Sequence, residues 1–257
     1  MEGVEDKALI YDSNCPMCCW YTDKFVQTGT LEKDGRISFD ELTTTQAACI
    51  DWQRGRHEIP LLDKKSGKVM YGLDGLTYIL SARWPFFAPV LQHPFGKKLV
   101  KPLYQFISYN RRIIVPHGVA AMPKYDCAPD FSLGWRLALI LICGGIFVGL
   151  SYAITVVQNP MAAMFIFLPT VLYLLTIVLG SRKNGREAMW NATGDFFVTQ
   201  LSTFLLFLPF FLLMKWLLND NVYGLLGAWM LMQVRLLFSF VRRMKNKGYM
   251  ADSQAVV

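Results

Sequence analysis

The chain has 257 residues, of which 53% are hydrophobic, and it carries a formal net charge of +7. This hydrophobic share exceeds that of an ordinary soluble domain, and Leu, Ile, Phe and Val dominate from about residue 135 onward. Residues 135–257 hold ten Lys or Arg against four Asp or Glu, whereas residues 1–134 hold sixteen against fifteen. Nucleic-acid binding requires a basic patch on a soluble surface. The excess charge lies instead at the ends of apolar segments, so no nucleic-acid partner is expected.

The N-terminus is acidic and no apolar segment follows it, unlike a secretory signal peptide. We therefore expect the first domain to stay on the side of the membrane where it is synthesised. Its first predicted elements are a buried strand at residues 8–11 and a helix over residues 19–26, separated by Cys15-Pro16-Met17-Cys18. Asn14 at or just before the N-cap, and Pro16 in the first turn, place Cys15 at the N-terminus of this helix.

This placement predicts redox chemistry for the cysteine pair. A helix N-terminus stabilises a thiolate, so Cys15 is predicted to have a lowered pKa and to act as the nucleophile. Cys18, one turn deeper, can then attack a mixed disulfide on Cys15 and release the substrate. The alternative is half of a zinc site, but zinc usually needs a second pair of ligands. The remaining cysteines form no second pair, and the three histidines are scattered, so we expect no metal and no cofactor beyond the redox-active pair.

The remaining cysteines are assigned lesser roles. Cys19 is expected to point about 100° away from Cys18 on the helix and to serve packing. Cys143 falls in a predicted membrane helix, where a small apolar residue suffices. Cys127 is the one additional thiol with a plausible place in a relay. Cys49 has no assigned role.

The rest of the first domain has the element order of thioredoxin. A strand at residues 36–39 and a helix over 43–52 precede a hairpin of residues 59–63 and 69–71, and a further helix covers 76–82. Pro60 opens the third strand, where the thioredoxin fold has a cis-proline beside the cysteine pair. A cis X-Pro bond is uncommon, and the alternative is an ordinary edge-strand proline. The sequence thus predicts an α/β thioredoxin-like domain over residues 1–112.

Tyr11-Asp12-x-x-Cys15-Pro16-x-Cys18 resembles the signature of the thiol-disulfide oxidoreductase DCC family. Ser13 stands where the family usually has glycine. The resemblance continues at Gly72-x-Asp74-Gly75 and closes at Leu103-Tyr104 and Asn110-Arg111. It covers roughly residues 7–112 and not the hydrophobic half. It implies a thioredoxin-like fold and thiol-disulfide exchange, and it adds Asp12 to the candidate site.

Residues 75–125 contain seven Lys or Arg and no Asp or Glu, interleaved with large apolar residues. This pattern predicts helices that lie on an anionic cytoplasmic leaflet. A helical subdomain that packs on the sheet with a solvated basic face is an equally supported alternative, and the two are compatible. Residues 113–134 contain five Pro or Gly and are expected to form an irregular connector.

The C-terminal half is predicted to be an all-α transmembrane four-helix bundle. Its spans, each near the roughly 20 apolar residues that a bilayer requires, are residues 135–157, 161–179, 196–218 and 222–241. Lys and Arg gather in the loop between the second and third spans and in the basic tail, residues 242–257. The positive-inside rule then places the first domain, this loop and the C-terminus in the cytoplasm. We expect a multi-pass protein of a bacterial-type inner membrane. The predicted spans contain no Asp, Glu or His, which favours an anchor over a transport path.

Three functions are compatible with these features. The first is a membrane-anchored thiol-disulfide oxidoreductase that uses Cys15 and Cys18 on a disulfide-bearing protein or a small thiol substrate. In a reducing cytosol it would act as a reductase. The second is a membrane assembly or partner-binding protein in which the cysteine motif is structural or vestigial. The third is passage of electrons to a membrane carrier such as a quinone. It has the least support, because the sequence has no paired membrane histidines and no Gly-rich dinucleotide loop.

Overall fold

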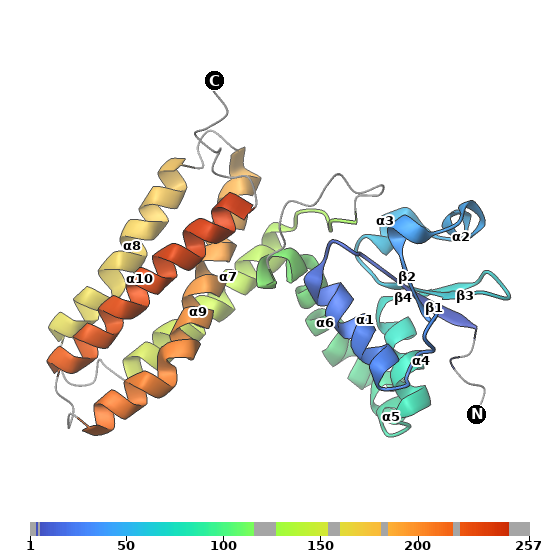
Figure 1. Cartoon of the computed structure of the whole chain (residues 1–257), viewed down its shortest axis with the longest axis horizontal. Coiled ribbons are helices and arrows are strands. Elements are labelled where there is room, and N and C mark those ends of the chain that lie inside the picture. Colours follow the sequence, from blue (N-terminus) through green and yellow to red (C-terminus); the bar gives the residue numbers. More distant parts are fainter. Residues whose placement is uncertain are drawn as a thin grey trace. The chain divides into compact units, whose positions relative to one another are not determined.

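The structure, a computed structural model, describes residue 4 and residues 6–115, 127–153, 160–180, 185–217 and 222–246. The chain divides into two compact units, Met1–Ser132 and Leu133–Val257. Figure 1 shows an α/β first unit and a helical second unit.

The first unit is built on a four-stranded sheet with the strand order β2-β1-β3-β4. β1 (Lys7–Tyr11) pairs in parallel with β2 (Arg36–Ser38) and antiparallel with β3 (Pro60–Asp63). β3 pairs antiparallel with β4 (Val69–Tyr71) through a tight hairpin. Parallel neighbours require a long crossover, and α1 (Pro16–Gln27) lies in the connection from β1 to β2. This mixed sheet with helices fits the predicted thioredoxin-like domain.

Helices cover both faces of the sheet because successive residues of a strand point to opposite sides. Leu9 packs toward α1 and α4 (Gly72–Arg83), whereas Ala8 and Ile10 pack toward the short helices α2 (Thr44–Ala48) and α3 (Trp52–Gly55). In Figure 1, α2 and α3 lie on one side of the strands and α4 on the other. The first cluster contains the buried residues Val4, Leu9, Leu31, Ile59, Leu61 and Ile79, and the second contains Ala8, Ile10, Phe39, Leu42, Ile50, Leu62 and Cys127.

The predicted helix over residues 43–52 is two helices. Thr43 caps α2, with its side chain accepting a hydrogen bond from the Gln46 N–H at 3.3 Å. Asp51 caps α3 in the same way, accepting from the Arg54 N–H at 3.1 Å. Each side chain starts its own helix, so the chain bends between them.

The predicted cis-proline at residue 60 is wrong: no cis peptide bond occurs in the described residues, so the Ile59–Pro60 bond is trans. The residue before Pro60, Ile59, is held by two hydrogen bonds. The Ile59 N–H donates to Tyr104 Oη at 3.0 Å, and the Ile59 carbonyl accepts from the Gly72 N–H at 2.9 Å. Trans is also the lower-energy form of an X-Pro bond by about 0.5–1 kcal/mol. Pro60 is a buried residue at the start of β3.

The first unit extends beyond the predicted domain end at residue 112. α5 (Phe87–Gln92) and α6 (Pro94–Ile114) follow α4, and residues 127–130 of the predicted connector return to the domain. Arg56 Nε donates to the Ala128 carbonyl at 3.0 Å and also forms an ion pair with Asp130 at 3.2 Å. Residues 116–126 of the connector lie outside the described residues.

The second unit contains the helices α7 (Leu133–Ser151), α8 (Pro160–Gly180), α9 (Gly185–Leu217) and α10 (Val222–Asn246). α9 packs against the other three, and its aromatic residues form edge-on and tilted contacts with α7 and α10, as Phe204 does with Phe147 and Trp229. Within the described parts of the chain, α7 and α9 are long and apolar enough to cross a bilayer, each with a mean hydropathy of 2.0 over its best window. The four predicted spans stay a prediction.

The predicted polar loop before the third span is largely helical, because α9 already begins at Gly185. Residues such as Glu187, Ala188 and Met189 are good helix formers. Asp195, expected in the loop, is fully buried inside α9, and its carboxylate lies 3.6 Å from the Arg243 guanidinium of α10. A buried acid therefore lies in the helical unit, and the argument for a simple anchor from missing acids loses force.

Candidate active site

The cysteine motif follows directly from the end of β1. The Cys15 N–H donates to the Asp12 carbonyl at 3.1 Å, and the Asn14 N–H donates to Asp12 Oδ1 at 3.0 Å. These bonds form a tight turn in which the Asp side chain replaces a backbone acceptor. Cys15 is the N-cap residue of α1 with extended backbone angles, and Pro16 occupies the first turn. Asn14 thus lies just before the cap.

Ser13 is accommodated without the glycine that the resemblance led us to expect. Among the described non-glycine residues only Asp6 has a positive φ, so Ser13 needs no glycine-specific conformation. Its hydroxyl donates to Asp40 Oδ2 at 2.8 Å, which ties the turn to the segment after β2.

The two thiols differ sharply in acidity. A hydrogen bond from the Cys18 thiol lowers the pKa of Cys15 to about 6; the Cys18 backbone N–H and the charge of Arg111 act in the same direction, against burial and Asp12. The same thiol–thiol bond raises the pKa of Cys18, and burial raises it further. Cys18 therefore keeps its proton and donates it toward Cys15. This asymmetry is what an attacking thiolate with a reserve thiol requires.

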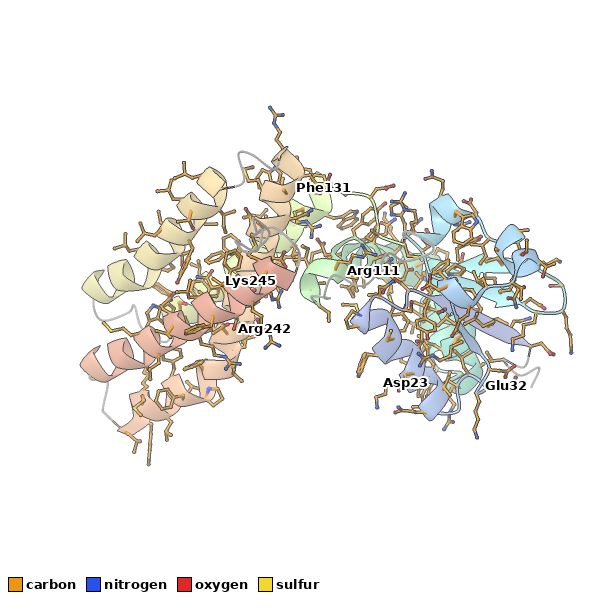
Figure 2. The ribbon with its side chains drawn as sticks, turned by 45° about the horizontal axis from the view of Figure 1, so that its top comes forward. Asp23, Glu32, Arg111, Phe131, Arg242 and Lys245 are labelled. Atoms are coloured by element: carbon orange, nitrogen blue, oxygen red, sulfur yellow. The ribbon has the colours of Figure 1, made fainter. Side chains whose placement is uncertain are left out.

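A buried guanidinium provides the nearby positive charge. Arg111, near the C-terminal end of α6, lies inside the first unit (Figure 2) and is 8% exposed. Its Nη2 lies 4.0 Å from Asp12 Oδ2, and it donates a hydrogen bond to the Cys127 carbonyl. The neighbouring Arg112 donates to the same Asp12 oxygen at 3.3 Å. Asp12, itself buried, thus orders the turn and contacts both arginines, of which Arg111 acts on the cysteine pair.

The interaction of α6 with the sheet sets the position of Arg111. The Ser108 hydroxyl donates to the His57 carbonyl, and the Tyr104 hydroxyl accepts from Ile59. Burial raises the pKa of Tyr104 to about 12, so this hydroxyl stays neutral. Asn110 is fully buried, with its amide donating to the Phe106 carbonyl. These bonds fix the rotation of α6 and aim Arg111 at the cysteines.

The structure brings Asp12, Cys15 and Cys18 together and adds the two arginines, which the sequence did not place in the site. The one available signal was the Asn110-Arg111 pair that closed the family resemblance. Pro60, the remaining predicted site residue, lies at the start of β3. Among the described residues it forms no hydrogen bond with Cys15 or Cys18.

The other four cysteines are free thiols outside the Cys15–Cys18 pair. Cys19 Sγ donates to the Ser13 carbonyl at 3.3 Å, so it packs against the turn. Cys127 is buried in the sheet core opposite α1, and burial raises its pKa to about 12. Cys49 is exposed and Cys143 is buried in α7. Within the described ranges no three His, Cys, Asp or Glu gather in a way that could hold a metal ion.

Comparison with known proteins agrees with this chemistry. Residues 9–115 match the family model of DCC1-like thiol-disulfide oxidoreductases. The match begins in β1 and ends just after α6, so it includes Asp12, Cys15, Cys18 and the two arginines. No curated protein and no solved structure shows a significant match to the chain. Residues 9–115 of this chain therefore form a domain of the DCC1-like thiol-disulfide oxidoreductase family.

Proposed function

We propose that the chain is a membrane-anchored thiol-disulfide oxidoreductase in which Cys15 is the nucleophile and Cys18 the resolving thiol. The observation that carries the proposal is the lowered pKa of Cys15 at the N-terminus of α1, with the proton retained on Cys18. At pH 7 Cys15 is then mainly a thiolate, the reactive form in disulfide exchange.

The reaction proceeds in two displacements. The Cys15 thiolate attacks one sulfur of a substrate disulfide, forms a mixed disulfide and releases the other substrate sulfur as a thiolate. Cys18 then loses its proton and attacks Cys15 Sγ. The Cys15–Cys18 disulfide forms, and the second substrate sulfur leaves. Two electrons pass to the substrate, whose two thiolates take up the Cys18 proton and one proton from solvent. Two equivalents of an external thiol such as glutathione then reduce the Cys15–Cys18 disulfide and restore the pair.

The surrounding groups favour the first displacement. Arg111 stabilises the negative charge that resides on Cys15 before attack. Its contact with Asp12 keeps the guanidinium in place within the protein interior, where a charge needs a partner. The exchange uses the two sulfurs alone, so we assign no cofactor. The substrate is a disulfide-bearing protein or a small disulfide.

The membrane assignment is supported by the second unit. α7 and α9 have the length and hydropathy of membrane spans, and the whole unit is proposed to cross the bilayer in four passes. Arg242, Arg243 and Lys245 at the end of α10 favour a cytoplasmic C-terminus by the positive-inside rule. With four passes the redox domain would also lie on the cytoplasmic side, where it would be exposed to a reducing pool of thiols.

One observation favours the second candidate, a membrane assembly or partner-binding protein with a structural cysteine motif. Cys15 is only 1% exposed and Cys18 4%. A substrate sulfur can reach Cys15 only when neighbouring groups move aside, whereas a structural motif needs no access. A redox titration separates the two candidates.

We expect the full-length protein to show one two-electron transition when it is equilibrated in detergent with mixtures of reduced and oxidised dithiothreitol. Free thiols are counted by alkylation and mass measurement. Two electrons give a tenfold change in the oxidised-to-reduced ratio per about 30 mV. The transition should disappear in Cys18→Ser and persist in Cys49→Ser, because Cys49 is exposed and lies outside the site. Bound zinc, or a wild-type pair that stays reduced through the whole series, would favour the structural candidate.

A further inference from the structure

The first unit exposes a band of large apolar side chains on one pair of helices. Phe95 is 72% exposed and Leu99 69%. Apart from Trp20, every large apolar side chain that is exposed in the described part of this unit lies on α6, on α5 or at the N-cap of α5. These residues are Phe86, Val90, Phe95, Leu99, Leu103 and Ile107.

The band is the outward face of α6. Phe95, Leu99, Leu103 and Ile107 recur every four residues and so line one side of the helix. The opposite side packs on the domain through Ser108, which is buried, and through the Tyr104 hydroxyl. α5 contacts α6 and adds Val90, so the apolar surface spans two adjacent helices (Figure 1). None of the residues of this band belongs to either core cluster of the unit.

The charges beside the band are positive. Lys98 and Lys101 are exposed on α6, and neither forms an ion pair with any residue that the structure describes. Lys97 pairs with Asp74 at 2.9 Å, and Asp74 lies just before the acid-free stretch of residues 75–125. An apolar face with basic flanks fits an interface rich in anionic phosphate headgroups, whereas Lys98 and Lys101 on both partners would repel a second copy of the same surface.

We propose that α5 and α6 dock in the plane of an anionic phospholipid bilayer, with the apolar band among the acyl chains and Lys98 and Lys101 at the phosphates. The continuation of the chain supports this occupant, because α7, with the properties of a membrane span, begins at Leu133. The docking is independent of the cysteine chemistry.

Docking has a consequence for the substrate, which does rest on the proposed function. Ile107 of the band and Arg111 of the redox site are four residues apart on one helix, which is about 6 Å of helical rise. The exchange site is then held close to the bilayer surface. Its substrates are disulfides that lie near the membrane, such as those in juxtamembrane segments.

The docking is tested by photo-crosslinking of the full-length chain. Benzoylphenylalanine replaces Leu99 or, as a control of similar exposure, Trp20 on α1, which is 65% exposed. The protein is placed in vesicles of phosphatidylethanolamine and phosphatidylglycerol, irradiated, and analysed for lipid adducts by mass spectrometry. Position 99 should form lipid adducts and position 20 should not. Vesicles of phosphatidylcholine alone should give fewer adducts at position 99.

Charge reversal tests the role of the lysines. Lys98→Glu with Lys101→Glu should lower the adduct yield at position 99 about tenfold or more, because each lysine at an anionic surface changes binding roughly fivefold. Lys33→Glu, on an exposed loop lysine, should leave it unchanged. Equal yields at positions 99 and 20, or adducts at position 99 to a second copy or to residues 133–257, would overturn the proposal. Cys15→Ser should leave the adduct yield unchanged, so a failure of the redox assignment is seen separately.

Discussion

Replacement of Cys15 by serine is expected to lower the rate of disulfide reduction by about 10³-fold or more. Removing the nucleophile of an enzyme leaves only binding and positioning to assist the reaction. A serine hydroxyl at this position cannot form a stable alkoxide at neutral pH, whereas the pKa of the Cys15 thiol is already about 6. The measurement is the reduction of a model disulfide by the full-length protein with glutathione as the final reductant.

The matched control is Cys49→Ser. Cys49 is exposed, and its sulfur donates to the Thr45 carbonyl at 3.4 Å, a bond that a serine hydroxyl can also make. This variant should retain the wild-type rate. A Cys15→Ser protein that reduces the disulfide as fast as Cys49→Ser would exclude Cys15 as the nucleophile.

Replacement of Arg111 by methionine is expected to raise the pKa of Cys15 by about one unit or more. The hydrogen bond from Cys18 remains, but the positive charge that favours the thiolate is lost. In the wild type, the thiolate fraction rises as the pH passes through about 6 and is nearly complete at pH 7. In Arg111→Met the same rise occurs at higher pH. The rate of Cys15 alkylation should therefore fall up to about tenfold at and below pH 6 and recover in more alkaline solution.

The measurement is the rate of Cys15 alkylation by iodoacetamide as a function of pH. Cys18 is kept, because the Cys18→Ala substitution would remove the hydrogen bond that sets the wild-type pKa of Cys15. Alkylation is therefore followed in the otherwise unchanged chain, with the site of reaction identified by peptide mass. Arg112→Met is the matched control. Arg112 contacts Asp12 and is not among the groups with the largest effects on the pKa of Cys15. Identical profiles for wild type and Arg111→Met would show that Arg111 does not stabilise the thiolate.

Features that depend on neighbouring residues could be predicted from the sequence. The turn at Asp12, the cap at Cys15 and the proline at residue 16 are local signals, and they place the cysteines at the start of α1 as observed. The hairpin of β3 and β4 is equally local, because its loop holds a glycine at residue 67 with a positive φ of 70°.

Features that depend on distant residues could not be predicted. Arg112 and Asp12 are 100 residues apart in the chain, and only the packing of α6 against the sheet brings them together. The cis-proline prediction failed for a related reason: it was transferred from the thioredoxin pattern. The residue before Pro60 is instead held by distant residues, through hydrogen bonds from the Ile59 N–H to Tyr104 Oη and from the Gly72 N–H to the Ile59 carbonyl. Asp195 was assigned to a loop because the sequence shows that the residue is charged. The sequence does not show that Asp195 pairs with Arg243.

The most direct test of the account is to trap the mixed disulfide. In Cys18→Ala the Cys15 thiol can attack a substrate but nothing attacks the resulting bond, so the intermediate accumulates. The full-length variant is expressed in cells and membranes are prepared from them. Free thiols are blocked, and covalent complexes are separated under non-reducing conditions. The account predicts complexes that disappear on reduction and whose linkage maps to Cys15. Their absence, or their equal abundance in a variant that lacks both Cys15 and Cys18, would contradict the assignment of this chain as a thiol-disulfide oxidoreductase.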